Sequence, residues 1–298
     1  MEHIRAAIER AKGASGAAGQ PQEQFASDAR QAQFLPNSVP SSVMWGKEVT
    51  IAGPYLESKR IVAHDIADPR SRSFDMLRTQ VLQSMDSKNS QLIGVTSPTP
   101  GCGKSLIAIN LALSIARQQE RSVLLVDLDL RRPQVASYLG LNSKDGLLSV
   151  LEGRSKLSNA ITQINVRDHR LLALPCEAPT LSSSEWMASR AMTAMLQEIR
   201  QVFRNWTVIV DLPPILPSDD VITILPQIDS TILVAAIGMS TMSEIKDCTK
   251  HLESAAVARV VLNKAPNPPA TYYAYMTHPD SMTKKRRWGL KRRASQRQ

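Results

Sequence analysis

The stretch TSPTPGCGKSLIAINLA, residues 96–112, decides the fold. Its first nine residues contain two prolines, two glycines and Lys104, and the rest turns abruptly apolar. It follows the short apolar run QLIGVTS, and its second half has the periodicity of a helix. A strand, a glycine-rich loop and a helix in this order are typical of a P-loop, in which backbone N–H groups and the helix N-terminus surround phosphate oxygens.

The residue types in this loop predict specific roles. Lys104 is expected to reach the β- and γ-phosphates of a nucleotide, and the hydroxyl of Ser105 is expected to bind Mg²⁺. The first glycine of the usual G-x-x-x-x-G-K-[ST] pattern is Pro98 here, so the strict pattern fails at one position. A glycine-rich turn that merely carries a lysine is the alternative, and the acids further along the chain argue against it.

Acidic residues end two later apolar runs. Asp211 ends TVIVD, a Walker B arrangement that holds Mg²⁺ through water, and Asp127 and Asp129 end VLLVDLD directly after the P-loop helix. Two carboxylates beside Mg²⁺-ATP can serve the metal and accept a proton from an attacking hydroxyl. A pair of acids at a strand end can also be a turn former or a helix cap, and the P-loop favours the first interpretation.

The other apolar runs complete an α/β pattern. RLLAL, STILVAA and ARVVLNK are predicted strands, with helical segments between most of the runs. One helix is predicted to begin at a capping box formed by Ser182 and Glu185. The sequence therefore predicts a P-loop NTPase with a mostly parallel sheet flanked by helices on both faces. In such sheets ligands bind beyond the carboxyl ends of the strands.

Composition restricts the class of protein. Of the 298 residues, 43% are hydrophobic, enough for one full core. The three cysteines form no C-x-x-C pair, which argues against a disulfide scaffold and a structural zinc site. No apolar run approaches the roughly 18–20 residues that span a bilayer, and the charged N-terminus is not a signal peptide. We therefore expect a cytoplasmic protein.

The net charge of +9 belongs to one end of the chain. Eight basic residues and no acidic one follow Asp280, so the rest carries 9 − 8 = +1. We expect three regions: a short helix and flexible linker at 1–59, the P-loop domain at 60–265, and a disordered basic tail at 266–298.

The motifs together resemble those of the bacterial tyrosine kinase (BY-kinase) family of capsule and exopolysaccharide synthesis, in its free-standing form. The shared features are Walker A at Gly101–Ser105, the NLA of Asn110–Ala112, the A′ motif D-x-D-x-R-R-P at Asp127–Pro133 and the Walker B D-x-P-P at Asp211–Pro214. GLLSVLEG and VVLNK also fit. The resemblance covers about residues 60–265, and the A′ motif is its most specific part.

The resemblance implies ATP- and Mg²⁺-dependent autophosphorylation on tyrosine, in trans between neighbours in a ring, that regulates polysaccharide assembly or export. The implied catalytic residues are Lys104, Asp127 and Asp129, and the implied metal-binding residues are Ser105, Asp127 and Asp211. The phosphoacceptors are Tyr272, Tyr273 and Tyr275 of ATYYAY. The implied nucleotide-binding residues are Thr99, Pro100, Gly101, Cys102, Gly103, Lys104, Ser105, Leu106 and, near the base, Asn263.

Three positions depart from the family pattern. The E-x-x-R-x-x-R helix that builds the ring is matched by Arg72, Asp75 and Arg78, of which only Arg78 keeps the family residue. Ala236 stands where many members have arginine. The sequence therefore does not predict ring assembly through the usual contacts.

The expected partners follow from the same features. A separate membrane-embedded chain-length regulator is expected to activate the kinase at the inner face of the membrane, and the kinase is expected to form a homo-oligomer. The tail KKRRWGLKRR is either simply solvated or drawn to anionic lipids, with nucleic acid ranked behind both.

Two other functions stay open. A ParA/MinD-type nucleotide switch would not transfer phosphate to protein, but its signature lysine is replaced by Thr99. A degenerate kinase could act as a scaffold, although the lysine and the three acids are intact.

Overall fold

The structure is a computed structural model that describes residues 45–142, 144–252 and 256–266. The predicted N-terminal helix, the tyrosines at 272, 273 and 275 and the basic tail lie outside the described residues. Within the described residues, no helix is both long enough and apolar enough to span a bilayer.

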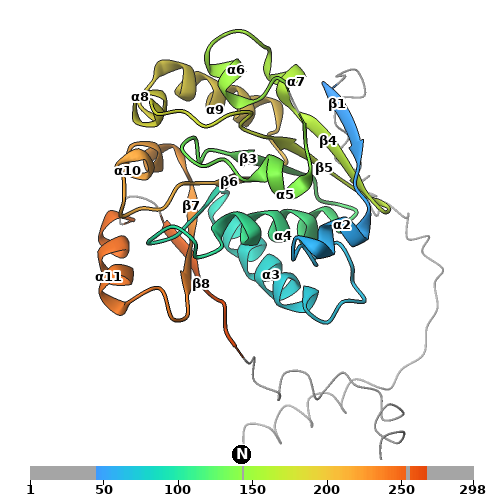
Figure 1. Cartoon of the computed structure of the whole chain (residues 1–298), viewed down its shortest axis with the longest axis vertical. Coiled ribbons are helices and arrows are strands. Elements are labelled where there is room, and N and C mark those ends of the chain that lie inside the picture. The colour runs from blue at the N-terminus through green and yellow to red at the C-terminus, as the bar shows by residue number, and fades with distance from the viewer. Residues whose placement is uncertain (1–44, 143, 253–255, 267–298) are drawn as a thin grey trace, which may run out of the picture. The chain divides into compact units, whose positions relative to one another are not determined.

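One eight-stranded sheet forms the centre of the fold, in the order β1-β4-β5-β3-β6-β2-β7-β8 (Figure 1). Six strands run parallel: β2 (Leu92–Thr96), β3 (Val123–Asp127), β5 (His169–Leu174), β6 (Thr207–Asp211), β7 (Ser230–Ala236) and β8 (Ala256–Asn263). All six contain an apolar run that the sequence predicts as a strand. The mostly parallel sheet is therefore confirmed.

Two strands run the other way. β4 (Thr162–Val166) pairs antiparallel with β5, and the edge strand β1 (Lys47–Thr50) pairs parallel with β4. β1 and the helix α2 (Gly53–Ser58) both precede residue 60, where the sequence predicts the domain to begin. The sheet therefore extends into the segment predicted as linker.

Helices cover both faces of the sheet (Figure 1). One face carries α2, α3 (Ser71–Lys88), the P-loop helix α4 (Lys104–Ala116) and α5 (Val135–Leu139). The other carries α6 (Leu147–Leu151), α7 (Leu157–Ala160), α8 (Ser183–Met187), α9 (Arg190–Val202), α10 (Asp220–Ile224) and α11 (Met242–His251).

The alternation of side chains along each strand divides the core in two. In β3, Leu124 and Val126 pack on the α9 side, whereas Val123 and Leu125 pack against α4. Because both sides of the central strands are covered, these strands are apolar throughout. The polar residues that follow them are therefore placed at the carboxyl edge of the sheet.

Helix caps differ from the prediction in one place. α8 follows Ser182 as expected, but the Ser182 side chain makes no capping hydrogen bond. The capping box forms instead at α11, where Thr241 and Glu244 bond reciprocally. The S-x-x-E spacing therefore marked a helix start but not its hydrogen bonds.

The Arg72, Asp75 and Arg78 stretch lies on α3, and two of its residues bond within the chain. Asp75 accepts hydrogen bonds from Ser114 Oγ at 2.7 Å, from Arg78 Nη1 at 3.1 Å and from Arg117 Nη2 at 3.1 Å. Arg78 Nη1 also donates to the carbonyl of Ser114 at 2.9 Å. The retained arginine thus fastens α3 to the P-loop helix α4.

This network predicts a stability effect. Asp75→Ala leaves Arg78 and Arg117, both largely buried, without their carboxylate, and we expect the free energy of unfolding to fall by about 2 kcal/mol. The melting temperature, measured by circular dichroism, should drop by about 4–8 °C. Asp86→Ala is the matched control, because it removes an exposed pair with Arg121 and should cost under about 1 kcal/mol. Equal shifts in both variants would show that the α3–α4 network is not stabilising.

Candidate nucleotide site

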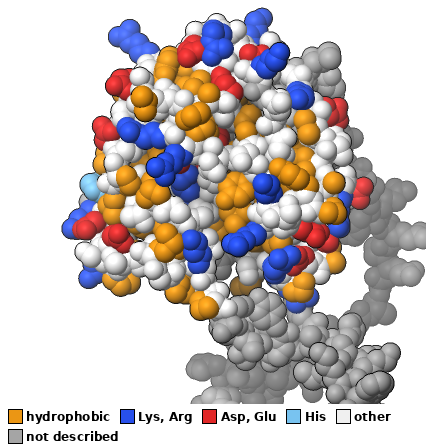
Figure 2. All heavy atoms as spheres, in the orientation of Figure 1, with side chains coloured by type: hydrophobic (Ala, Val, Ile, Leu, Met, Phe, Trp, Pro, Cys, Tyr) orange, Lys and Arg blue, Asp and Glu red, His pale blue; other side chains and the backbone are white. Residues whose placement is uncertain are grey.

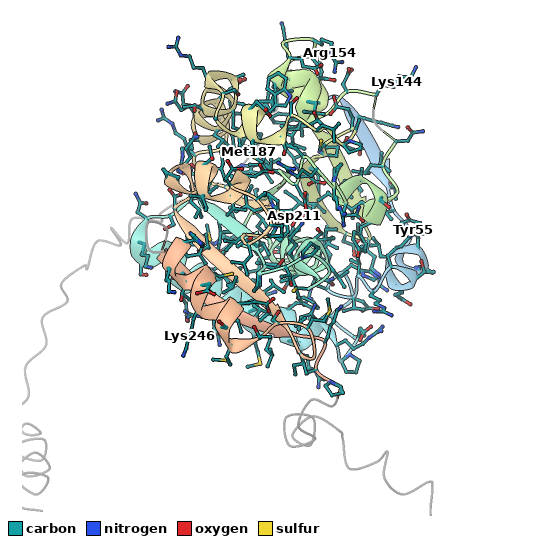
Figure 3. All side chains as sticks on the ribbon, turned by 60° about the vertical axis from the view of Figure 1, so that its left-hand side comes forward. Tyr55, Lys144, Arg154, Met187, Asp211 and Lys246 are labelled. Atoms are coloured by element: carbon teal, nitrogen blue, oxygen red, sulfur yellow. The ribbon has the colours of Figure 1, made fainter. Side chains whose placement is uncertain are left out.

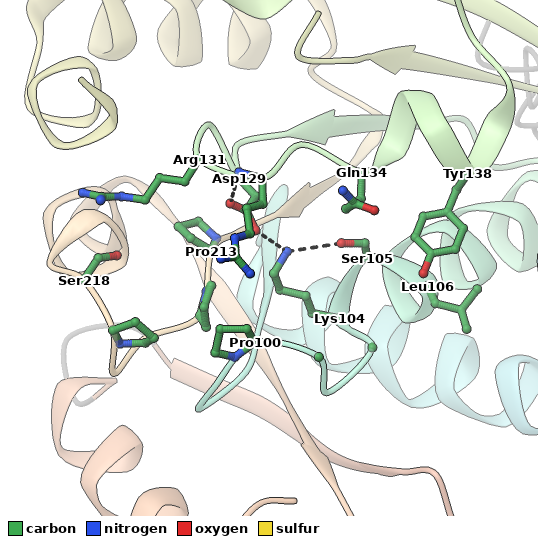
Figure 4. Close-up of a pocket in the computed structure, with 15 residues that line it drawn as sticks. Pro100, Lys104, Ser105, Leu106, Asp129, Arg131, Gln134, Tyr138, Pro213 and Ser218 are labelled. Atoms are coloured by element: carbon green, nitrogen blue, oxygen red, sulfur yellow. Dashed lines mark hydrogen bonds and ion pairs between the residues drawn. The ribbon is translucent and has the colours of Figure 1, made fainter. Parts of the chain in front are cut away.

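A cavity of about 500 Å³ opens at the carboxyl edge of the sheet (Figure 4). The P-loop residues that line it are Pro100, Gly101, Gly103, Lys104, Ser105 and Leu106. The A′ segment contributes Asp129, Arg131, Arg132, Gln134 and Tyr138, and the segment after β6 contributes Pro213, Pro214, Pro217 and Ser218. The cavity thus lies where the P-loop motif predicts nucleotide binding.

The P-loop backbone has the curvature that the motif requires. Gly101 and Gly103 have φ values of +84° and +95°, which residues other than glycine rarely adopt. A Cβ atom on Gly103 would also lie 2.3 Å from Asn263 Nδ2. Glycine at 103 is therefore required both by the backbone and by the close approach of β8.

Lys104 joins the P-loop to two of the predicted acids. Its Nζ lies 2.7 Å from Asp129 Oδ2 and donates to Ser105 Oγ at 3.2 Å (Figure 4). The same Nζ lies 3.3 Å from Asp211 Oδ1. Burial would lower the pKa of Lys104, but the charges of Asp211 and Asp129 outweigh it and raise that pKa above its ordinary value. The lysine is therefore charged and held at the floor of the cavity.

Asp127 shapes the A′ loop. Its Oδ1 accepts from the Asp129 N–H at 3.2 Å, and its Oδ2 accepts from the Gln134 and Val135 N–H groups at 3.0 and 2.9 Å. Asp129 in turn accepts from the Arg132 N–H at 3.0 Å. These bonds turn the backbone back over the cavity and direct Asp129 toward Lys104.

Asp211 lies in the interior at the end of β6 and is fully buried (Figure 3). Its Oδ2 is buried without any hydrogen-bond partner. Burial raises the pKa of Asp211 and of Asp127, and the charge of Asp211 adds to the effect on Asp127. Leaving a carboxylate oxygen unpaired at such a depth is costly unless a cation or water meets it.

The charges of the site fit a divalent cation. Three buried carboxyl groups, those of Asp127, Asp129 and Asp211, lie near one ammonium group, that of Lys104. Full ionisation of the three would leave an excess of two negative charges, which burial disfavours and a divalent cation would balance. Mg²⁺ is commonly held by one or two protein groups together with substrate phosphates, and the described residues contain no preformed cluster of three or more His, Cys, Asp or Glu ligands. The donor set therefore suits Mg²⁺ delivered with a nucleotide.

The remaining predicted residues lie around the site without lining it. Thr99 and Cys102 are in the loop, where their side chains approach each other at 3.7 Å. Asn263 donates from Nδ2 to the Cys102 carbonyl at 2.8 Å and accepts from the Lys264 N–H. It therefore supports the P-loop backbone from β8, and it does not line the cavity.

Several lining residues were not singled out from the sequence, namely Arg131, Arg132, Gln134, Tyr138, Pro213, Pro214, Pro217 and Ser218. The arginines and two of the prolines lie within the recognised motifs, so motif membership was the available signal. Asp220, which binds Arg131, lies beyond both motifs and gave no local signal.

Comparison with known proteins identifies the family. The model of the ParA family, described as NUBPL iron-transfer P-loop NTPase, matches residues 88–260, more than half of the chain. The chain therefore belongs to the ParA family of P-loop NTPases.

Several curated relatives are named as bacterial tyrosine kinases. EpsB of Ralstonia nicotianae, named as a candidate tyrosine-protein kinase, is 30% identical over 75% of this chain. The tyrosine-protein kinase YwqD of Bacillus subtilis is 29% identical over 72% of this chain and 90% of its own length. The crystal structure of the chimerical protein CapA2B2 matches with a TM-score of 0.63 and 28% identity, covering 77% of this chain and 98% of that one. The chain spans 29% of the length of EpsB.

Proposed function

We propose that this protein is an ATP-dependent protein-tyrosine autokinase that serves exopolysaccharide or capsule assembly. The main observation behind the proposal is that Lys104 Nζ lies within 3.3 Å of side-chain oxygens of Ser105, Asp129 and Asp211, beside the A′ loop. The kinase names of its relatives support the reaction type.

The residues divide the work of binding and transfer. The P-loop backbone and Lys104 bind the β- and γ-phosphates, and Ser105, Asp127 and Asp211 would hold Mg²⁺. When bound, the ion would neutralise phosphate charge. Lys104 bridges Asp129 and Asp211, so phosphate binding draws the ammonium toward the nucleotide and releases a carboxylate.

Asp129 is suited to accept the proton of the attacking hydroxyl. It is the one carboxylate among the three acids that lines the cavity. The tyrosine Oη attacks the γ-phosphorus, the bond to the bridging oxygen breaks, and its electron pair leaves with ADP. The phenol proton passes to Asp129 Oδ2, the oxygen that Lys104 contacts at 2.7 Å.

The acceptor assignment has a direct test. Replacing Tyr272, Tyr273 and Tyr275 with Phe should remove most phosphotyrosine, because these residues are three of the five tyrosines in the chain. The measurement is incorporation of labelled phosphate from Mg²⁺-ATP into the full chain. Tyr55→Phe is the control, since Tyr55 lies on α2 and does not line the cavity, and it should keep the wild-type signal. An unchanged signal in the triple variant would place the acceptor elsewhere.

A further inference from the structure

We propose that Arg132 binds the γ-phosphoryl group in this cavity, whereas its neighbour Arg131 serves only to hold the A′ loop in place. The inference rests on the proposed function, because it assigns a role within the same site. It separates two adjacent arginines that the sequence motif presents as equivalent.

Arg131 is committed to a buried carboxylate away from Lys104. Its Nε donates to Asp220 Oδ2 at 2.9 Å and its Nη2 donates to Ser184 Oγ at 3.1 Å. Figure 4 shows the Arg131 side chain directed away from Lys104, toward the helix that follows Ser218.

Asp220 is completely buried at the start of α10. It also accepts from Ser183 Oγ at 2.8 Å and Ser184 Oγ at 2.5 Å. Burial would raise the pKa of Asp220, but these hydrogen bonds and Arg131 lower it, so the carboxylate stays charged. Arg131 therefore joins the A′ loop to α8 and α10, and moving its guanidinium to a ligand would leave a buried charge unpaired.

Arg132 shares the exposure and the cavity-lining position of Arg131 but lacks its partners. Its side chain is exposed, it lines the cavity, and within the described residues no hydrogen bond or ion pair of its guanidinium is found. The other charges that line the cavity are already matched: Lys104 with Asp129, and Arg131 with Asp220. Among the lining residues of the described chain, Arg132 is thus the cation with no counter-ion.

The backbone of Arg132 is held close to Lys104. The Arg132 N–H donates to Asp129 Oδ1 at 3.0 Å, and Oδ2 of the same carboxylate lies 2.7 Å from Lys104 Nζ. A single carboxylate therefore separates the Arg132 backbone, from which the guanidinium extends, from the lysine that meets the β- and γ-phosphates. Because Pro133 follows, the chain direction beyond Arg132 is restricted as well.

The ligand chemistry follows from this position. A guanidinium offers a planar set of N–H donors that match phosphate oxygens. Charge accumulates on the three non-bridging oxygens of the γ-phosphoryl group during transfer, and Arg132 can donate to them while the tyrosine–phosphorus bond forms and ADP leaves. The arginine gains and loses no covalent bond in this step.

The test compares Arg132→Gln with Arg131→Gln in the full chain, using affinities for Mg²⁺-ATPγS and Mg²⁺-ADP by calorimetry and the initial rate of phosphotyrosine formation. For Arg132→Gln we expect the affinity for ATPγS to fall about 10-fold with the ADP affinity unchanged, and the rate to fall by about 10²-fold or more. Arg132→Lys should recover part of both. The melting temperature should stay at the wild-type value.

Arg131→Gln should show the reverse pattern: a lower melting temperature with a wild-type ratio of ATPγS to ADP affinity. A wild-type ratio in Arg132→Gln, or an equal loss for ATPγS and ADP, would overturn the inference. If the wild-type protein forms no phosphotyrosine, the kinase proposal fails, yet the affinity ratio still tests Arg132.

Discussion

Lys104→Met is expected to abolish phosphotyrosine formation. The ammonium is the cation that the structure places against Asp129 and Asp211, and the P-loop mechanism gives it the β- and γ-phosphates. Its loss should lower the rate by about 10³-fold, comparable to removing a preorganised donor from a transition state. The measurement is the initial rate of labelled phosphate transfer at saturating Mg²⁺-ATP.

A second variant keeps this prediction independent of folding. Lys104→Met leaves three buried carboxylates without their ammonium, so its melting temperature should be recorded alongside the rate. Ser105→Ala retains the lysine and removes only the proposed metal-binding hydroxyl, and it should lower the rate and raise the Mg²⁺ concentration needed for the half-maximal rate. Full activity in a folded Lys104→Met protein would contradict the assignment of the site.

Asp129→Asn should lower phosphotransfer by about 10²- to 10³-fold while nucleotide binding persists. The amide keeps the shape of the carboxylate but cannot accept the phenol proton, and general-base contributions have this size. Since Asp129 is the acid that lines the cavity, its loss should affect kcat more than KM. The rate should be measured across pH with ATP saturating.

The control for this variant is Asp168→Asn. Asp168 is exposed between β4 and β5 and does not line the cavity, so the rate should not change. An Asp129→Asn protein with a wild-type kcat would show that the proton is accepted by another group, and it would leave Asp129 only the part of a partner for Lys104.

The centre of the fold could be predicted from the sequence because the motifs that define it lie within short segments of the chain. The P-loop joins β2 to α4 within a few residues, and the apolar runs that end in Asp127 and Asp211 are buried on both faces of the sheet. The acids therefore had to emerge at one edge, beside the loop. Lys104, Ser105, Asp129 and Asp211 were all named from their spacing, and the structure brings them together.

The features that sequence did not predict depend on distant contacts. β1 lies at the edge of the sheet and is largely exposed, and β4 alternates between buried and partly exposed residues. Neither strand is therefore a continuous apolar run in the sequence. The pairing of Arg131 with Asp220 joins residues 89 positions apart, and Asp75 binds Arg117 across 42 positions. Charged side chains carry no indication of their partner until the helices are placed.

The surface charges are a further case in which the sequence does not predict which side chains pair. Basic, acidic and apolar side chains are intermixed over the face seen in Figure 2, so composition alone does not distinguish a paired arginine from an unpaired one. Arg131 and Arg132 are adjacent in sequence and differ only in what the fold places beside them. Their separate roles follow from the buried Asp220 and the cavity.

The most direct test of the central claim is phosphosite mapping by mass spectrometry of the purified full chain after incubation with Mg²⁺-ATP, with Lys104→Met treated in parallel. The account predicts phosphate on Tyr272, Tyr273 or Tyr275 in the wild-type protein and none in the variant. Both proteins should also be incubated with the cytoplasmic segment of a candidate membrane activator. Nucleotide binding or hydrolysis without phosphotyrosine under either condition would contradict the kinase assignment and favour a nucleotide switch or a scaffold.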